Sequence, residues 1–218
     1  MTPNETTYHR MDAAVSQSAD TPSTPGRKRP KPGERRLQIL QTIAAMLQEG
    51  AAEKVTTAAL AAKLSLSEAA LYRHFASKAQ MFEGLLDFIE ETVFSLINQI
   101  EARNTPAAGK AREIVLMLLN FAEKNPGMTR VLIGDAIVNE DARLQARVNQ
   151  LMERVEASLR QCARLHAAES STAAGDPLVQ SGMAMAFVQG RWLQFAKSGF
   201  KKRPSDSADA AVKLLFSA

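Results

Sequence analysis

Three helix-start signals lie close together between residues 55 and 82, and they constrain the local fold more than any other feature of this chain. In each of them a hydroxyl side chain stands where it can accept the unpaired backbone N–H groups of a helix's first turn. The three candidate caps are Thr56 or Thr57, Ser67 and Ser77. Gln80, three residues after Ser77, completes a capping box. The stretch therefore predicts two short helices, a tight turn and the start of a third helix.

The second of these helices is predicted from Glu68 to about His74, directly after a turn at Ser65. Its apolar residues are expected to point inward, which leaves Tyr72 and Arg73 available on the outside. A second helix presented in this way commonly enters the DNA major groove and contacts base edges. The spacing thus indicates a helix-turn-helix DNA-binding unit.

This stretch resembles the DNA-binding unit of the TetR family of repressors, whose pattern runs Thr-Thr, Leu-Ala, Ser, Leu-Tyr-x-x-Phe, Ser-Lys. The matching positions are Thr56, Thr57, Leu60, Ala61, Ser67, Leu71, Tyr72, Phe75, Ser77 and Lys78. One departure is Ser65, where members of the family often carry Gly; a left-handed backbone there would cost a Ser a modest penalty. The resemblance implies an all-α, TetR-like fold, with a three-helix helix-turn-helix domain followed by a helical domain for dimerisation and partner binding.

Two sets of residues are expected to contact double-stranded DNA. The phosphate set is Arg27, Lys28, Arg29, Lys31 and Lys78. The set at or near base edges is Thr57, Ser67, Glu68, Ala69, Tyr72 and Arg73, with Thr56 beside them as a cap. For His74 the resemblance suggests a phosphate contact, while a helix C-terminal residue that favours the helix dipole is the alternative.

The positive charge of the chain is concentrated directly before its first predicted helix. The formal net charge is +4, and residues 27 to 36 alone hold six Lys or Arg against one Glu. A basic arm beside a helix-turn-helix is typical of a protein that binds the phosphate backbone. A linker that merely solubilises the chain is the alternative.

The chain divides into three predicted regions. Residues 1–33 are rich in Pro, Ser and Thr without hydrophobic periodicity, which predicts a disordered basic tail. Residues 34–78 form the helix-turn-helix domain, and residues 79–218 the helical dimerisation and partner-binding domain. In the latter we expect a long linking helix from Lys78, an apolar helix from about Ala111 to Glu123, and later helices opened by Asp176 and by about Asp206.

Composition argues against several other classes of protein. Cys162 is the only cysteine, so no intrachain disulfide can form, and the three histidines lack metal-ligand spacing. No Gly-rich phosphate loop or nucleophile motif is visible, so neither an enzyme nor a cofactor is expected. With no apolar run long enough for a membrane span or a signal peptide, we expect a cytoplasmic, nucleoid-associated protein.

The second domain carries a narrower resemblance, to the nucleoid occlusion factors within the TetR family. The similar segments begin at Ile114, continue from Asp141 and reappear at Phe200. This resemblance implies a DNA-bound homodimer that binds the tubulin-like division GTPase FtsZ and disrupts its polymers. The tail of FtsZ is expected in a groove lined by Phe88, Met117, Asn120, Lys124 and Asn125.

Two alternatives stay open at this point. The family often has Gly at the position of Asn120, and Arg at those of Leu96 and Lys124, and an apolar face with one Lys is more often an ordinary domain surface. The dimer interface is expected at Met183, Met185, Phe187, Trp192 and Phe195, although these can instead be core residues. A ligand-responsive transcriptional repressor is the alternative function.

Overall fold

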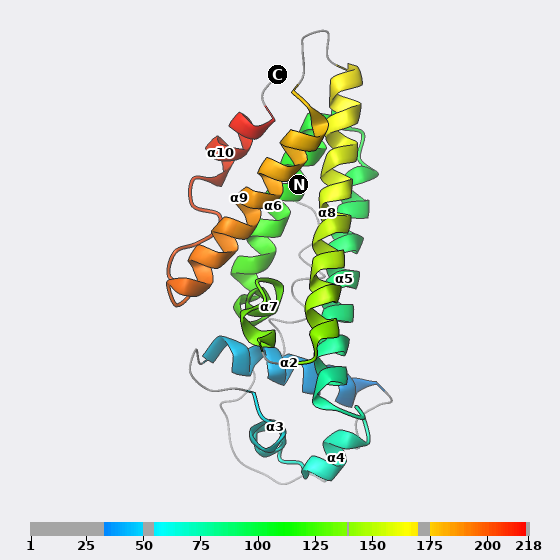
Figure 1. The fold of residues 1–218 in the computed structure, drawn as a ribbon, viewed down its shortest axis with the longest axis vertical. Coiled ribbons are helices and arrows are strands. Elements are labelled where there is room, and N and C mark those ends of the chain that lie inside the picture. Colours follow the sequence, from blue (N-terminus) through cyan, green and yellow to red (C-terminus); the bar gives the residue numbers. More distant parts are fainter. Residues whose placement is uncertain (1–32, 50–54, 139, 170–174, 217–218) are drawn as a thin grey trace, which may run out of the picture.

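A computed structural model describes residues 33–49, 55–138, 140–169 and 175–216, and all of its regular secondary structure is helical (Figure 1). The expectation of an all-α fold is confirmed. The helices of the helix-turn-helix end are α2 (Glu34–Glu49), α3 (Thr57–Leu64) and α4 (Glu68–Tyr72). Those of the larger body are α5 (Lys78–Glu101), α6 (Ala107–Lys124), α7 (Pro126–Leu132), η1 (Asp135–Ile137), α8 (Ala142–Glu169), α9 (Pro177–Lys197) and α10 (Ala208–Leu215).

The three hydroxyl caps form as their positions in the sequence predict. Oγ1 of Thr56 accepts a hydrogen bond from the backbone N–H of Ala59 at 3.1 Å, which starts α3. Oγ of Ser67 starts α4, accepting from a backbone N–H at 3.2 Å, and Oγ of Ser77 starts α5 in the same way at 3.1 Å. Because each cap satisfies a donor of the first turn, three helix starts fit into one short stretch.

The turn between α3 and α4 requires an unusual backbone at Ser65. This residue has φ 52° and ψ 47°, the left-handed conformation expected at that position. Its N–H and that of Leu66 donate to carbonyls in the last turn of α3, so the end of the helix is closed. The following helix, predicted to reach about His74, ends at Tyr72, and Arg73 forms its C-cap.

Four long helices make the body, with α6 packed among α5, α8 and α9. The indole N–H of Trp192 donates to the carbonyl of Leu118 at 3.2 Å, so α9 is tied to the centre of α6. Helix α6 begins at Ala107, four residues earlier than the expected Ala111, because Pro106 forms its N-cap and Gly109 is accommodated within the helix. No helix in the described ranges has both the length and the apolarity to cross a bilayer.

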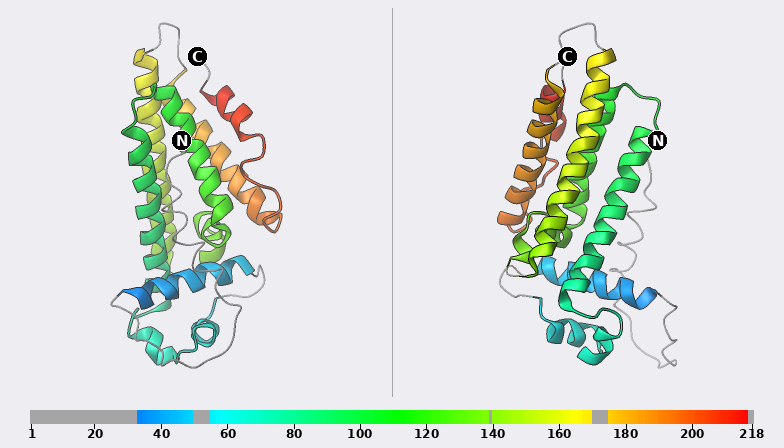
Figure 2. Two further views of the ribbon diagram at one scale, coloured as in Figure 1. Left: turned by 180° about the vertical axis from the view of Figure 1, so that it is seen from behind. Right: turned by 45° about the vertical axis from the view of Figure 1, so that its right-hand side comes forward.

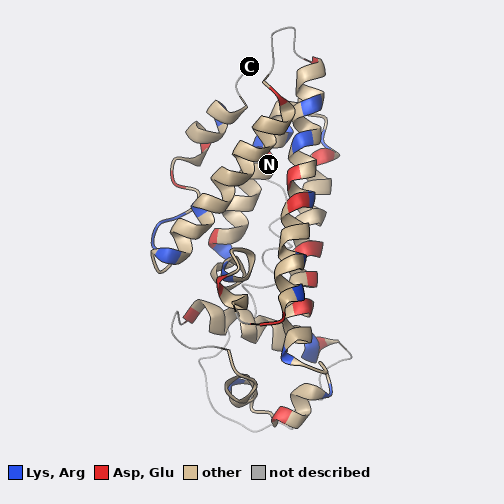
Figure 3. Cartoon of the chain, in the orientation of Figure 1, with Lys and Arg blue, Asp and Glu red and all other residues tan. Residues whose placement is uncertain are grey.

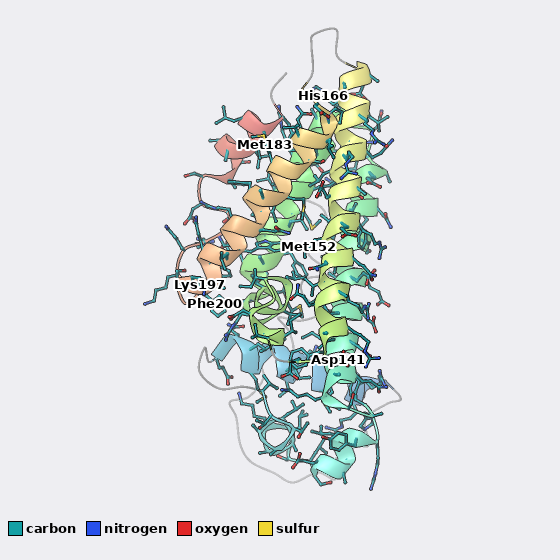
Figure 4. All side chains as sticks on the ribbon, viewed as in Figure 1. Asp141, Met152, His166, Met183, Lys197 and Phe200 are labelled. Atoms are coloured by element: carbon teal, nitrogen blue, oxygen red, sulfur yellow. The ribbon has the colours of Figure 1, made fainter. Side chains whose placement is uncertain are left out.

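The buried side of α8 does not include every leucine of the helix. Leu165 is 46% exposed, whereas His166 is buried near the end of α8 remote from α2 (Figure 4). The reason is helical geometry, because steps of three and four residues from Leu159 lead to Cys162 and then to His166. The outer edge shared by α8 and its neighbour α5 is charged (Figure 3), and Glu90 pairs there with Arg147 at 3.0 Å.

Two contacts join α2 to α7, and an ion pair holds the start of α5 beside the segment before α8. A Cβ atom on Gly127 of α7 would lie 1.9 Å from the backbone oxygen of Ala44, so α7 and α2 touch at their backbones. Arg130 of α7 donates to the carbonyl of Leu47 at 3.3 Å, and α2 has no basic residue of its own in its last turn. Farther along, Lys78 forms an ion pair with Glu140, in the segment before α8.

Candidate nucleic-acid interface and partner groove

The outer side of α4 carries most of the residues that we expect at base edges. Ser67, Glu68, Ala69, Tyr72 and Arg73 are all exposed. Their orientation follows from the opposite side of the helix, where Leu71 is fully buried and Phe75, just beyond the helix, is 1% exposed. The short helix therefore has one face anchored in the core and one presented to solvent, at the end of the molecule remote from α10 (Figure 1).

The start of α3 lies beside the start of α4. Oγ1 of Thr57 donates a hydrogen bond to the carboxylate of Glu68 at 2.5 Å, which joins the first turns of the two helices. Thr56, the cap of α3, is exposed next to this contact. The structure thus brings together three residues that the sequence predicts at one interface, and it gives the Glu68 carboxylate a fixed position from which it can accept hydrogen bonds.

Arg36 of α2 holds the C-terminal end of α4. The sequence predicts this residue only as part of the basic run. The guanidinium of Arg36 donates to the backbone carbonyl of His74 at 2.6 Å and lies 4.1 Å from the ring centroid of Phe75. His74 itself is half-buried. A cation at the C-terminal end of a helix is favourable both to its unpaired carbonyls and to its dipole. Arg36 therefore orients α4 from outside the two motif helices.

Lys78, expected at a phosphate, is half-buried and already engaged in the structure. Its ammonium is paired with Glu140 and lies 5.7 Å from the ring centroid of Phe82. A phosphate of bound DNA would compete with Glu140 for this cation. The remaining expected phosphate contacts, Arg27, Lys28, Arg29 and Lys31, lie outside the described residues.

The predicted partner residues come from two adjacent helices. Phe88 of α5 is half-buried, and α6 contributes Met117, half-buried, with Asn120 and Lys124 exposed. Seen from behind (Figure 2, left), α5 and α6 lie side by side and α2 crosses beneath their lower ends. Asn125, at the junction of α6 and α7, donates through Nδ2 to the carbonyl of Phe121 at 2.8 Å.

Leu96, where the family often has Arg, lies inside the body. Its side chain is only 7% exposed on α5, so it packs inward and adds no polar group to the outer surface. The cationic group among the predicted partner residues is therefore Lys124, at the lower end of α6. A Lys provides a compact ammonium rather than the planar fork of an Arg.

Below Lys124 and Asn125 the molecule forms a groove of about 570 Å³ between the α6–α7 junction and one side of α2. Glu123 also lines the groove. Partial burial alone would raise the pKa of Glu123, but hydrogen bonds from Ser205 and Arg203 outweigh it and hold that pKa below its usual range. Both partners come from the segment between α9 and α10, so this carboxylate ties a distant loop to α6.

The five residues expected at a dimer interface separate into two groups on α9. Met185, Trp192 and Phe195 are at most 3% exposed and pack within the chain, so their burial requires no second copy. Met183 (labelled in Figure 4) is 56% exposed. Phe187 is half-buried. Three further apolar side chains of α9 are also exposed and were not predicted at an interface: Leu178, Val179 and Leu193.

Two further observations concern metal-binding and nucleophilic groups among the described residues. These residues contain no group of three or more His, Cys, Asp or Glu arranged to hold a metal ion. Burial raises the pKa of the Cys162 thiol to about 11, so at neutral pH it remains protonated and poorly nucleophilic.

Comparison with known sequences covers both ends of the chain. Residues 39–85 match the family of bacterial regulatory proteins called the tetR family, and residues 107–218 match the SlmA-like family of tetracyclin repressor-like C-terminal domains. The nucleoid occlusion factor SlmA of Alteromonas mediterranea is 44% identical over 190 residues, covering 85% of this chain and 97% of that protein. SlmA of Escherichia coli O1:K1 / APEC is 45% identical over 183 residues, covering 83% and 92%.

Solved structures resemble the whole arrangement of helices. The fatty acid degradation regulator FadR from Bacillus halodurans superposes with a TM-score of 0.69 at 13% identity, covering 88% of this chain and 98% of that one. AibR, solved with isovaleryl coenzyme A and operator DNA, gives 0.68 at 17% identity, covering 84% and 98%. At such low identities this likeness concerns the fold alone.

Proposed function

The chain belongs to the SlmA family of nucleoid occlusion factors within the TetR family, and from this membership we propose that it is a DNA-bound inhibitor of cell division. It binds chromosomal sites as a dimer and antagonises the assembly of FtsZ over the nucleoid. The observation that carries the proposal is the identity of 44% over 190 residues, which extends through the second domain as well as the DNA-binding unit. A resemblance limited to the helix-turn-helix would support DNA binding alone.

The DNA step is supported by the presentation of α4. Tyr72 and Arg73 stand on its exposed side while Leu71 anchors the opposite side. In the proposed complex α4 enters the major groove and Lys78 contacts a phosphate, which positions the helix on the duplex. The basic segment before α2 adds sequence-independent attraction to the phosphate backbone.

The dimer step is supported by the outer side of α9. Met183 and Leu193 are exposed, and a Cβ atom added at Gly182 or Gly190 would meet nothing within 4 Å. A helix side that combines exposed apolar side chains with glycines allows close approach of a second helix. We therefore assign the interface to this side of α9, with Met183 and Phe187 retained from the expected set and Leu193 added.

The partner step is supported by the side-by-side arrangement of α5 and α6. Phe88 and Met117 offer half-buried apolar surface, and Lys124 adds a cation at the end of the same row. An extended tail with apolar side chains and a carboxylate fits such a surface, because the apolar groups are desolvated while the carboxylate meets the ammonium.

One binding experiment tests the proposal directly. Fluorescence anisotropy of a labelled peptide with the FtsZ C-terminal tail sequence is measured against full-length protein saturated with operator DNA. We expect saturable binding, weakened when Phe88→Ala removes the apolar anchor. No binding by DNA-saturated protein would refute FtsZ recognition.

A genome-wide map of bound sites separates this function from that of a ligand-responsive repressor. Occlusion predicts many dispersed sites that are sparse near the replication terminus. A repressor predicts a few promoter sites and release of DNA by a small molecule. The second pattern would overturn the proposed function while leaving DNA binding intact.

A further inference from the structure

Glu68 puts a negative charge on the side of α4 that the proposed complex turns toward DNA. The residue is exposed, and a step of four residues places it on the same side of the helix as Tyr72. A carboxylate in the groove is repelled by the phosphates on either side of it. It therefore lowers the affinity for DNA in general, unless a base supplies it with a hydrogen-bond donor.

Thr57 holds this carboxylate in one position. Its Oγ1 donates to Oε2 of Glu68 at 2.5 Å, from the first turn of α3 to the first turn of α4. Neither helix start depends on this bond, because the cap of α3 is Thr56 and the cap of α4 is Ser67. The contact thus orients Glu68 and is not needed to begin either helix.

The second carboxylate oxygen of Glu68, Oε1, is available for a base. Among the described residues it receives no hydrogen bond, and Glu68 forms no ion pair. A carboxylate only accepts hydrogen bonds. In the major groove cytosine presents a donor, its N4 amino group, without an acceptor, whereas adenine adds N7, guanine presents N7 and O6, and thymine presents O4 and a methyl group. The best match for Oε1 is therefore the amino group of a cytosine.

The Thr57 hydroxyl has a different role from that of a side chain that contacts a base itself. Its proton is directed at Glu68, so it has no donor left for a phosphate or a base. Because the Glu68 side chain is already held, less entropy is lost when it is ordered in the complex. Thr57 is thus a positioning residue, and Glu68 is the group that contacts the base.

We propose that the Thr57–Glu68 pair determines sequence specificity: Glu68 selects cytosine at one position of each half-site, and Thr57 fixes the carboxylate for that contact. The inference rests on the DNA step of the proposed function and deepens it. Repulsion from phosphates acts on every sequence, whereas the bond to cytosine forms on few of them. The pair therefore raises the ratio of specific to non-specific affinity more than it raises the affinity for the specific site.

The first test is selection of bound duplexes from a random DNA library by the full-length protein. Wild type is compared with Glu68→Gln and with Glu101→Gln, which removes an exposed carboxylate at the end of α5 remote from α4 (Figure 1). We expect wild type to enrich cytosine roughly tenfold over the other bases at one position of the half-site, as for one direct base contact. Glu101→Gln should behave in the same way, and Glu68→Gln should lose the preference at that position alone.

Fluorescence anisotropy with labelled duplexes gives a second readout. Glu68→Gln should bind a duplex of unrelated sequence about two- to fivefold more tightly than wild type, because one negative charge near the phosphates is gone. The same variant should lose affinity for the selected duplex relative to the unrelated one. A purely structural role of Glu68 would instead weaken binding to both duplexes, and that result would overturn the proposal.

Thr57 is tested through the base preference. Thr57→Val keeps the branched shape but removes the hydroxyl, and it should reduce the preference for cytosine about fivefold, as for one net hydrogen bond. Thr57→Ser, which retains the hydroxyl, should restore the preference. In the Glu68→Gln background Thr57→Val should have no further effect on base preference, since the group that it positions is gone.

The outcomes separate this inference from the proposed function. If wild type and Glu68→Gln select the same sequence, the base contact is refuted while DNA binding stands. A base other than cytosine at the position that Glu68→Gln alters would also overturn it, and a full cytosine preference in Thr57→Val would refute the positioning role. If wild type binds no duplex at all, the DNA step of the proposed function fails first and the specificity pair fails with it.

Discussion

Ser65 is a non-glycine residue with a left-handed backbone, as are Phe200 and Ser207, and it takes this conformation in the turn between α3 and α4. A Cβ atom disfavours that conformation, whereas Gly adopts it readily. We predict that Ser65→Gly raises the free energy of unfolding by up to about 1 kcal/mol, with part of the gain offset by greater freedom of the unfolded chain. Ser65→Val should destabilise, since a β-branched residue is least tolerant of positive φ. Urea denaturation measures both, and a destabilised Ser65→Gly would contradict this account.

Glu123 links stability to pH through its bonds to Arg203 and Ser205. Its folded pKa is lowered, so its contribution is present above the unfolded pKa and is lost as pH falls through the folded value. Glu123→Gln should cost about 1 kcal/mol at pH 7, and the difference from wild type should shrink below about pH 4. Thermal melts from pH 3 to 8 provide the measurement, with Glu153→Gln on the exposed side of α8 as the control for charge. A difference that persists unchanged at pH 3 would exclude titration of Glu123 as its source.

The crossing of α7 over α2 is the element-scale contact on which the relation between the two parts depends. Gly127→Ala would place a methyl carbon against the backbone oxygen of Ala44, and backbone yields less than a flexible side chain. We predict a loss of about 2–3 kcal/mol in unfolding free energy. Gly109→Ala in α6, where nothing lies within 4 Å, should instead be neutral or gain about 0.5–1 kcal/mol. Equal effects of the two substitutions in urea denaturation would refute the close crossing.

Helix starts were predictable here because cap and first turn are only a few residues apart. Ser67 and Ser77 cap as their spacing indicates, and Asp176 accepts from the N–H of Leu178 at 2.8 Å. Contacts between distant elements gave no such signal: Lys78 and Glu140 are 62 residues apart, and neither helical period nor charge pattern pairs them. The same limit applied to Arg203, which meets Glu123 across 80 residues.

The candidate interfaces show a further limit at element scale. Helix α9 carries apolar residues on more than one side, so its pattern could not separate Trp192, buried in the core, from Met183, exposed on the surface. On α4, by contrast, the burial of Leu71 fixes the outward direction of its neighbours, and Glu68, Ala69 and Tyr72 are exposed. Sequence reasoning could therefore identify the exposed side of α4 but not that of α9.

At the scale of the whole molecule, the exposed apolar side of α9 predicts self-association. Leu193→Glu would bury a charge against a second copy, at a cost of several kcal/mol in an apolar interface. We expect wild type to be a dimer and this variant a monomer at micromolar concentration in light scattering. Leu37→Glu, at a Leu of α2 that is also partly exposed, should leave the dimer intact. A dimeric Leu193→Glu would move the interface elsewhere.

The Lys78–Glu140 pair connects DNA binding to the body, because one ammonium cannot serve both a phosphate and Glu140 equally well. Both side chains are partly buried, at 27% and 19% exposure, so the pair must be disrupted when DNA takes the cation. Glu140→Gln removes this competition and should tighten DNA binding by up to about fivefold, as for a pair worth about 1 kcal/mol.

The double-mutant cycle with Lys78→Gln makes this explanation testable. Lys78→Gln alone should weaken binding to all DNA sequences and lower the salt slope by about 0.9. In that background Glu140→Gln should have no further effect, since the ammonium for which it competes is gone. An equal gain from Glu140→Gln with and without Lys78 would instead indicate general repulsion between the Glu140 carboxylate and DNA, with no competition at Lys78.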